Sequence, residues 1–312
     1  MKNKKKHFFV TGGTGFIGSA ICELLVNKGH KVTVYDDNSR GSARRVIHLK
    51  NKIKLIKGDI RNYEQLNKAM VNVDAVIHLA YINGTKFFYT KPVLILDIAI
   101  KGIVNIIQLC VKKKIKEIYL ASSSEVYQTP KKVPTDEKES LKIPDIYNPR
   151  YSYGGGKILS ELMGIHFGKK YFKKLIIFRP HNVYGPNMGY EHVIPEFIKR
   201  FKNLKNKIFK IQGTGNEIRS FIYIDDFINA FNLILNKGKH LNIYNIGTSE
   251  KIKIKYLASK LSKLFNKKIK LKRTSVKKGG TKIRLPDIKK IKKLGYEQKV
   301  SLTQGLKKII KI

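Results

Sequence analysis

Short apolar runs and helix-like patterns alternate through the first part of the chain. The apolar runs are rich in β-branched and aromatic side chains and end near glycine or polar clusters, which is typical of buried strands. The predicted strands lie within residues 7–13, 31–37, 52–59, 74–80 and 115–124. Segments with apolar side chains at helical spacing lie between them. This alternation predicts an α/β fold, in which crossover helices connect the strands of a parallel sheet.

The pattern changes after roughly residue 180, where longer loops rich in Pro, Gly and Asn separate the apolar runs. Residues 223–235 have helical spacing and residues 242–248 have an extended pattern. We therefore expect part of the 220–247 segment to pack back on the first region. The chain is predicted to have a first domain over residues 1–180 and a smaller second region over residues 181–312.

Composition places the chain among ordinary globular proteins, apart from its charge. Its 312 residues are 42% hydrophobic, and its two cysteines, Cys22 and Cys110, lie in predicted helices. Neither a disulfide framework nor a metal site is indicated. The basic start leads into a strand without a cleavable apolar stretch. The most apolar segment, residues 93–100, is shorter than a membrane helix requires and contains Asp97. We expect a cytoplasmic protein with no bound metal and no membrane partner.

The formal net charge of +42 produces a positive field that attracts polyanions. The lysines are spread through the whole chain, and no nucleic-acid-binding module accompanies them. We interpret the charge as a compositional bias and expect no specific nucleic-acid partner. A functional nucleic-acid surface is the alternative, and anionic substrates are attracted in both cases.

A glycine-rich segment, residues 11–18, joins the first predicted strand to a helix. Its glycines allow a tight turn and a close approach of the backbone to a pyrophosphate, and the helix N-terminus presents free N–H groups to that anion. A merely structural turn is the alternative interpretation. The residues that this motif assigns to a dinucleotide are Gly12, Gly15, Phe16, Ile17 and Gly18.

Asp36 ends the second predicted strand. A carboxylate at this point accepts hydrogen bonds from both hydroxyls of the adenosine ribose and repels a 2′-phosphate. The sequence therefore predicts NAD as the cofactor. Arg40 and Arg44, which follow Asp36, are the features that favour NADP instead.

Tyr153 and Lys157 are separated by three glycines at the start of a predicted helix, and positions i and i+4 share a helix face. The phenol of tyrosine has a pKa of about 10, which an adjacent ammonium and a cationic nicotinamide ring lower, so Tyr153 is predicted to act as a base. Each glycine costs about 1 kcal/mol relative to alanine in a helix. We expect the backbone there to pass close to a cofactor or a partner helix; a flexible loop is the alternative.

A serine-rich turn, Ser122 to Ser124, follows the predicted strand within residues 115–124, and Glu125 comes next. Ligands of open α/β proteins bind at the carboxyl ends of the strands. One of these serines is expected to hold a substrate hydroxyl for Tyr153, and Glu125 adds a carboxylate nearby. The alternative is a turn that only caps a helix.

These motifs resemble the extended short-chain dehydrogenase/reductase family. The matching segments run in order over nearly the whole chain: TGGTGFIG, Asp36, GDIRN, VIHLA, SSSEVY, NPRYSYGGGK, RPHNVYGP, RSFIYIDD, YNIG and RLPDIKKIKKLGYE. Within that family the chain is similar to nucleotide-sugar epimerases, dehydratases and decarboxylases. The resemblance implies a Rossmann-type doubly wound parallel sheet that binds NAD over residues 1–180, and a smaller C-terminal substrate-binding domain that contacts a nucleotide-sugar, mainly over residues 181–312.

The resemblance also implies roles for single residues. Ser123 is expected to pair with Tyr153, and Lys157 to bind the nicotinamide ribose. Asp59 and Ile60 are expected near the adenine. The residues expected on the nucleotide-sugar are Ser124, Asn182, Arg219 and Arg284. Glu125 is expected to be catalytic, together with Ser123, Tyr153 and Lys157.

Departures from the family pattern bear on the reaction. Sugar 4,6-dehydratases usually carry an Asp-Glu pair where this chain has Ser124-Glu125, and the missing aspartate is their acid for water loss. A Ser-Glu pair resembles UDP-glucuronate decarboxylases and also occurs in proteins similar to plain epimerases. Ala99 replaces the usual asparagine of an Asn-x-x-Gly pattern, and Tyr81 follows the HLA segment, both near the expected nicotinamide site.

We interpret the chain as an epimerase similar to UDP-glucose 4-epimerases, in which hydride passes from carbon 4 to NAD and a transient 4-keto-sugar forms. A decarboxylase similar to UDP-glucuronate decarboxylases and a nucleotide-sugar 4,6-dehydratase are the alternatives. Outside the enzymes, a dinucleotide-binding regulator and a polyanion-binding protein remain. As in the family, we expect a homodimer through helices at residues 92–113 and 152–171.

Overall fold

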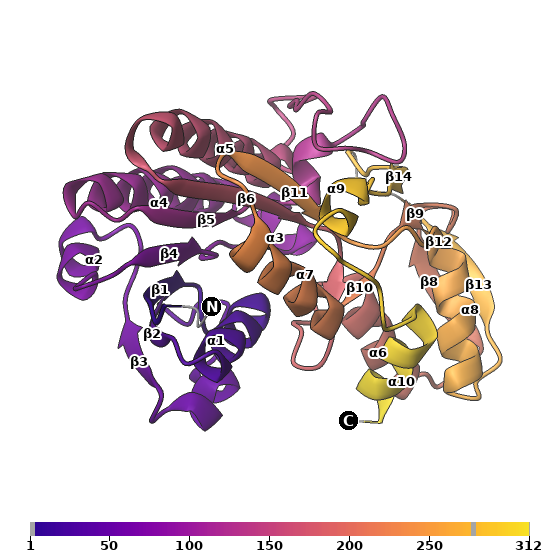
Figure 1. Cartoon of the computed structure of the whole chain (residues 1–312). Coiled ribbons are helices and arrows are strands. Elements are labelled where there is room, and N and C mark those ends of the chain that lie inside the picture. The colour runs from indigo at the N-terminus through magenta and orange to yellow at the C-terminus, as the bar shows by residue number, and fades with distance from the viewer. Residues whose placement is uncertain (1–3, 276–278, 312) are drawn as a thin grey trace.

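The computed structural model describes residues 4–275 and 279–311. A seven-stranded, wholly parallel sheet with the order β11-β6-β5-β4-β1-β2-β3 forms its centre (Figure 1). The predicted α/β fold with a doubly wound parallel sheet is confirmed. The strands are β1 (His7–Thr11), β2 (Lys31–Asp36), β3 (Ile53–Lys57), β4 (Ala75–His78), β5 (Glu117–Ala121), β6 (Lys174–Pro180) and β11 (Asn242–Ile246).

Apolar side chains alternate between the two faces of the sheet and form two cores. In β1, Phe8 and Val10 belong to one core, whereas Phe9 belongs to the other. This alternation is the period of two that a strand imposes on its side chains. The helices that supply the Val10 core are α1 (Phe16–Asn27) and α7 (Ile224–Lys237). The helices that supply the Phe9 core are α2 (Tyr63–Ala69), α3 (Thr85–Thr90), α4 (Pro92–Lys112) and α5 (Tyr151–Tyr171).

Two elements from the 220–247 segment complete the central layers. Strand β11 pairs in parallel with β6, with Tyr244 opposite Phe178. Helix α7 packs beside α1. The chain thus returns to the first region after it has built part of the second.

The remaining elements form a smaller lobe beside the sheet (Figure 1). The apolar side chains of this lobe continue the core that α1 and α7 cover. Its strands are β7 (Val183–Tyr184), β8 (Ile208–Gln212), β9 (Ile218–Arg219), β10 (Ile222–Tyr223), β12 (Ile252–Lys253), β13 (Lys270–Thr274) and β14 (Ile283–Arg284). Its helices are α6 (Val193–Lys202), α8 (Ile254–Leu264), α9 (Lys289–Lys292) and α10 (Leu302–Ile310). Two 3₁₀ helices of the sheet region are η1 (Ala43–Leu49) and η2 (Ser124–Tyr127).

Among the described residues, α4 alone meets the length and apolarity of a membrane-crossing helix. The sequence analysis underestimated this segment, because the apolar pattern continues beyond Asp97 and Lys101. In the fold, 56% of its most apolar stretch is buried. It packs along α5 and against the sheet, as the core helix of a globular protein does.

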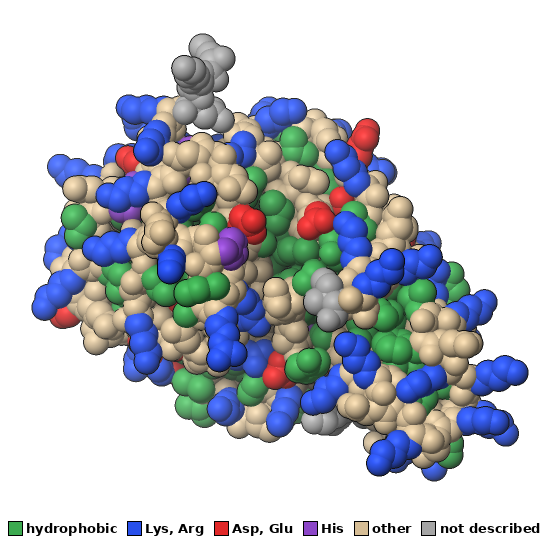
Figure 2. All heavy atoms as spheres, turned by 90° about the horizontal axis from the view of Figure 1, so that it is seen from below, with side chains coloured by type: hydrophobic (Ala, Val, Ile, Leu, Met, Phe, Trp, Pro, Cys, Tyr) green, Lys and Arg blue, Asp and Glu red, His purple; other side chains and the backbone are tan. Residues whose placement is uncertain are grey.

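Lysine and arginine side chains are scattered over the face seen in Figure 2 and do not form a single patch on it. This distribution matches the even spread of lysines along the sequence. A dispersed charge of this kind provides long-range attraction for anions without marking one docking surface.

Candidate active site

A cavity of about 1750 Å³ opens at the carboxyl ends of the central strands and extends into the smaller lobe. Strands β1 and β4 are neighbours in the sheet, and the chain order runs away from them in opposite directions. Such a switch point leaves a crevice between the connecting segments, where open α/β proteins bind their ligands. The cavity therefore lies where this topology places a site.

The glycine-rich turn between β1 and α1 forms one wall of the cavity. Gly12 has a φ angle of 72°, and a Cβ built on it would lie 2.6 Å from the backbone nitrogen of Ala80. A Cβ on Gly18 would overlap the carbonyl oxygen of Gly12. No described side chain caps the N-terminus of α1. The first N–H groups of this helix therefore remain for an anionic ligand, and the turn fits a pyrophosphate.

Asp36 lies beside this turn at the end of β2, and its side chain is buried. The backbone N–H groups of Thr14 and Asn38 donate to its two carboxylate oxygens, at 2.9 and 2.8 Å. Each oxygen has a further lone pair, so the carboxylate can still accept hydrogen bonds from ribose hydroxyls. These residues fit the ribose of NAD.

The basic residues after Asp36 are arranged differently from the sequence expectation. Arg40 lines the cavity, but Arg44 is exposed and lies outside its lining. Arg45, which the sequence analysis did not single out, lines the cavity instead. The two positions are adjacent in a 3₁₀ helix, η1, so only the local backbone turn decides which of them faces inward.

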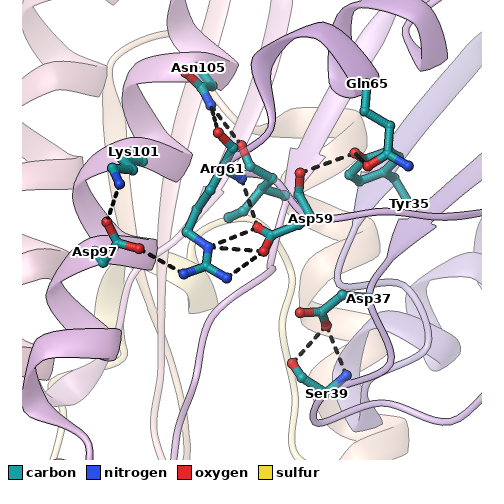
Figure 3. Close-up of polar contacts among 10 residues, drawn as sticks. Tyr35, Asp37, Ser39, Asp59, Arg61, Gln65, Asp97, Lys101 and Asn105 are labelled. Carbon is teal, nitrogen blue, oxygen red and sulfur yellow. Dashed lines mark hydrogen bonds and ion pairs between the residues drawn. The ribbon is translucent and has the colours of Figure 1, made fainter.

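Asp59 and Ile60 follow β3 and line the cavity. Figure 3 shows Asp59 beside Arg61, which also reaches Asp97. Nε of Arg61 donates to both carboxylate oxygens of Asp59, at 3.1 and 2.9 Å, and these hydrogen bonds lower the pKa of Asp59. Nη1 of Arg61 also donates to Asp97 of α4 at 2.7 Å. Asn105 of α4 donates to the carbonyl of Ile60 at 2.9 Å. Helix α4 thus fixes the segment that carries Asp59.

Tyr153 and Lys157 of α5 reach the carboxyl end of β5. The ammonium of Lys157 donates to the carbonyl of Ala121 at 2.6 Å and lies 6.0 Å from the centre of the Tyr153 ring. The hydroxyl of Ser123 is hydrogen-bonded to the Tyr153 phenol. The Tyr153 ring stacks on Phe88, with 4.8 Å between ring centres. The predicted Ser-Tyr-Lys set is therefore together in space.

Burial dominates the protonation of this set. Burial raises the pKa of Tyr153, and the hydrogen bond with Ser123 opposes that rise. Burial also lowers the pKa of Lys157 to about 7, against the charge of Glu161 on the next turn. The expected lowering of the Tyr153 pKa is not produced by these protein groups, because desolvation outweighs the hydrogen bond from Ser123. A further positive charge beside the phenol is needed.

The three glycines between Tyr153 and Lys157 lie within the continuous helix α5. A Cβ on Gly156 would overlap the hydroxyl of Tyr81 and lie 2.6 Å from Cβ of Ala99 in α4. A Cβ on Gly154 would lie 2.5 Å from Nε2 of Gln128. Close packing therefore explains Gly156, which faces Ala99 of a partner helix, and Gly154, which faces Gln128. The flexible-loop interpretation is wrong, because all three glycines lie in the helix. The two family departures, Tyr81 and Ala99, contact the same point.

Glu125 lies among three arginines from distant parts of the sequence. Arg284 of β14 donates to both of its oxygens, at 2.8 and 2.9 Å, and Arg150 at the start of α5 lies 3.5 Å away. Burial raises the pKa of Glu125, but the arginine charges outweigh burial and hold that pKa below its usual value. Burial and the like charge of Arg284 lower the pKa of Arg219 to about 9, so Arg219 remains cationic at neutral pH.

Ser124 and Asn182 lie in the wall on the same side. The amide nitrogen of Asn182 donates to the carbonyl of Ser220 at 2.7 Å, which leaves its amide oxygen as an acceptor. The guanidinium of Arg219 donates to the carbonyls of Ile218 and Thr281, each at 2.8 Å. These bonds hold the guanidinium in place without neutralising it.

All of the sequence-predicted site residues line this one cavity. They are Gly12, Gly15, Phe16, Ile17, Gly18, Asp36, Asp59, Ile60, Ser123, Ser124, Glu125, Tyr153, Lys157, Asn182, Arg219 and Arg284. The sequence analysis missed Arg150, although it lies within the NPRYSYGGGK motif, and it missed Phe88, for which the sequence offers no signal. Within residues 4–275 and 279–311, no group of three or more His, Cys, Asp or Glu side chains is placed to hold a metal ion.

A glycine-rich turn at the switch point of a parallel sheet, with a tyrosine and a lysine at the adjacent strand ends, defines a dinucleotide-dependent enzyme of the Rossmann class. The chain belongs to the NAD-dependent epimerase/dehydratase family, which it matches over residues 8–247. It is therefore an NAD-dependent enzyme, and its relatives act on nucleotide-sugars as epimerases, dehydratases and decarboxylases.

Three relatives illustrate the range of reactions. The chain is 31% identical to a UDP-N-acetyl-α-D-glucosaminuronate decarboxylase of Bacillus cytotoxicus, over 98% of this chain and 97% of the relative. It is 30% identical to a putative UDP-glucose 4-epimerase of Methanocaldococcus jannaschii, over 96% of each chain. The structure of a UDP-glucose 4-epimerase of Thermotoga maritima with UDP-glucose is 27% identical, with a TM-score of 0.88 and coverage of 98% and 97%. Similarity of this degree sets the family and leaves the reaction to the details of the site.

Proposed function

We propose that this chain is a nucleotide-sugar epimerase that works through a transient 4-keto-sugar, similar to UDP-glucose 4-epimerases. The observation that carries the proposal is the meeting of Ser123, Tyr153 and Lys157 beside the glycine-rich turn, in one cavity. An epimerase needs one acid–base group and one hydride carrier, because both serve the forward and the return half of the reaction. This arrangement supplies the acid–base group and a binding site for NAD, the hydride carrier.

In this proposal Tyr153 removes the proton from the hydroxyl at carbon 4 and gives it back when the ketone is reduced. Ser123 aligns that hydroxyl through its bond to the phenol. Lys157 binds the nicotinamide ribose and adds positive charge near the phenol. Bound NAD would supply the hydride acceptor for carbon 4 and the hydride donor to the opposite face of the ketone. Because burial raises the pKa of Tyr153, the phenolate would need the positive charge of the oxidised nicotinamide ring beside it.

The cofactor is proposed to lie along the turn and the strand ends of the first region. The N–H groups at the start of α1 and the close-packed glycines hold the pyrophosphate. Asp36 binds the adenosine ribose, and Asp59 with Ile60 borders the adenine. The residues with this proposed role are Gly12, Gly15, Phe16, Ile17, Gly18, Asp36, Asp59, Ile60 and Lys157.

The nucleotide-sugar is proposed to occupy the end of the cavity in the smaller lobe. Arg219 donates to backbone carbonyls and to no carboxylate among the described residues, so its charge suits a diphosphate. Asn182 and Ser124 offer polar atoms beside it, and Arg284 with Glu125 borders the sugar. This placement directs the sugar toward Tyr153.

Dehydration is the reaction that the site supports least. Ser124 stands where an acid for water loss is expected, and a hydroxyl is a poor proton donor. Glu125 is held as a carboxylate by Arg284 and Arg150, so it is not a ready acid either. Epimerisation needs neither group as an acid.

Decarboxylation is a second candidate, and the arginine cluster favours it. Arg150, Arg219 and Arg284 surround a single carboxylate, Glu125, which leaves this end of the cavity positive. A sugar that carries its own carboxylate would be attracted there. The relative from Bacillus cytotoxicus is a decarboxylase of such a sugar.

A homodimer through α4 and α5 is also proposed. These helices pack along each other and keep apolar side chains exposed, with 79% of Val93, 46% of Ile100 and 51% of Leu162 accessible. Contiguous exposed apolar surface on paired helices is typical of a subunit interface. Light scattering at low and high salt tests this, and a monomer under both conditions contradicts it.

A cytoplasmic location is also proposed. The two buried, free cysteines are compatible with it.

Incubation of the purified protein with UDP-glucose, UDP-N-acetylglucosamine, UDP-glucuronate and dTDP-glucose, followed by NMR, tests the proposal. We expect inversion at carbon 4 without accumulation of reduced cofactor. Loss of carbon dioxide from the uronate would identify the decarboxylase instead, and a 4-keto-6-deoxy product the dehydratase. Binding of NAD without turnover of any nucleotide-sugar would favour the alternative that the protein is a dinucleotide-binding regulator. The Tyr153→Phe variant is the control for each product.

A further inference from the structure

Residues 187–191, between β7 and α6, lie beside the loop that follows β2. Nη2 of Arg40 in that loop donates to the carboxylate of Glu191 at 3.0 Å and to the carbonyl of Asn83 at 3.1 Å. The guanidinium of Arg40 lies 4.4 Å from the centre of the Phe87 ring. Arg40 is thus held on three sides, and Glu191 is the carboxylate with which it forms an ion pair.

A second arginine joins the same two segments. Nε and Nη2 of Arg45 donate to the carbonyl of Asn187, at 3.1 and 2.9 Å. Nη1 of Arg45 donates to the carbonyl of Thr14 at 3.2 Å and to the carbonyl of Arg40 at 3.5 Å. The substrate side of the cavity is therefore attached to the cofactor side through two neighbouring arginines.

This attachment lies next to the carboxylate that distinguishes the two dinucleotides. The backbone N–H of Thr14 donates to Asp36, and the carbonyl of the same residue accepts from Arg45. Arg40 and Asp36 both line the cavity at this end. An arginine in this position is the group that accommodates the 2′-phosphate of NADP in related sheets. Arg40 has the right chemistry for that ligand and is engaged elsewhere.

We propose that Glu191 is a determinant of cofactor specificity that acts from the substrate side of the cavity. By pairing with Arg40 it keeps the guanidinium away from the 2′ position of the ribose, so Asp36 alone meets that position. Rejection of NADP then has two parts, repulsion by Asp36 and occupation of Arg40. A site becomes specific when it favours one ligand and also penalises the other. Here Asp36 favours the ribose hydroxyls of NAD, and the engaged Arg40 leaves the 2′-phosphate of NADP without a partner.

Four variants separate these parts: Glu191→Gln, Arg40→Ala, the double variant Arg40→Ala/Glu191→Gln, and Asp225→Asn as the control. Asp225 forms an exposed ion pair with Lys308 at 3.4 Å and lies outside the cavity lining. Calorimetry with NADH and NADPH gives the ratio of the two affinities for each protein. Glu191→Ala provides a second test if the glutamine keeps a hydrogen bond to Arg40.

In Glu191→Gln we expect the affinity for NADPH to rise relative to NADH by about tenfold, the scale of one charge-assisted hydrogen bond to a phosphate. The gain should be absent from the double variant, since it depends on Arg40, and absent from Asp225→Asn. An unchanged ratio in both Glu191 variants would overturn the proposal, and so would a gain that persists without Arg40. The measurement uses cofactor binding only, so it is independent of which sugar reaction the enzyme performs.

Discussion

The proposed cofactor end of the cavity depends on closely packed backbone, whereas the proposed sugar end depends on a cluster of charged side chains. Gly12 and Gly18 leave no space for a Cβ, and the helix N-terminus beside them lacks a side-chain cap. At the other end the largely buried carboxylate of Glu125 lies among arginines. We propose that the first end binds the pyrophosphate of NAD and that the second end selects the sugar. Side chains at the second end can be exchanged without altering the fold.

The two ends also differ in how the sequence assembles them. The turn, its helix and Asp36 come from one continuous strand-helix-strand unit. Glu125, Arg150 and Arg284 come from η2, α5 and β14, which only the complete fold brings together. Local geometry therefore fixes the cofactor site, whereas the sugar site depends on the packing of the smaller lobe against the sheet.

The largest effect is expected for Glu125→Leu, which tests whether charge balance holds the sugar end together. The change leaves Arg284 and Arg150 buried without their carboxylate, and breaking a buried ion pair from one side costs about 3–5 kcal/mol. Urea unfolding should show a loss of that order. Glu196→Gln, in the partly exposed pair with Arg200 on α6, should alter the free energy of unfolding by about 0.5 kcal/mol or less. Equal losses in the two variants would contradict this account of Glu125.

The next effect concerns the point where the two ends meet. Tyr153→Phe removes one oxygen and should lower turnover by at least about a hundredfold while NAD affinity changes little. Turnover is measured on the donor found by the NMR panel, and NAD affinity by calorimetry. Wild-type turnover in this variant would show that another group removes the proton, and Glu125 would be the first to test.

A smaller effect, on stability, should distinguish the close approach of Gly12 to Ala80 from the strain of a positive φ angle. Gly12 and Gly29 both have positive φ angles, of 72° and 77°, but a Cβ on Gly29 meets nothing within 4 Å. Gly29→Ala should therefore cost only the strain of that conformation, about 1–2 kcal/mol. Gly12→Ala should cost more and should also weaken NAD binding. Equal behaviour of the two variants in thermal unfolding and calorimetry would show that Ala80 does not constrain the turn.

A further effect is a dependence on pH. The usual lysine pKa is about 10.4, and burial lowers that of Lys157 to about 7. Between these values the unfolded chain binds more protons than the folded chain, so the contribution of Lys157 makes the free energy of unfolding rise with pH. Without added NAD, Lys157→Met should reduce this rise between about pH 7 and pH 9. The exposed Lys50→Met variant should keep it, and an unchanged slope in Lys157→Met would show that Lys157 is not desolvated.

The sequence predicted the parallel sheet, and it predicted that the glycine turn and Asp36 lie at the ends of neighbouring strands, because both depend on local patterns. Strand β1, the glycine turn and Asp36 follow one another within a single supersecondary unit. The engagement of Arg40 and Arg45 with Glu191 and Asn187 could not be predicted, because the partners are far apart in the chain and one bond is to a backbone carbonyl. The protonation of Tyr153 was also beyond the sequence. It depends on burial, which a motif does not record.

The glycines of α5 have a consequence for the order in which the protein assembles. An isolated helix with Gly154, Gly155 and Gly156 near its start is weak, since each glycine costs about 1 kcal/mol relative to alanine. The first turns of α5 therefore gain their stability from α4, against which Gly156 packs. We therefore expect the segment around Tyr153 to become ordered only when α5 packs on α4. Amide hydrogens in this part of α5 should then exchange faster than those in the middle of α4.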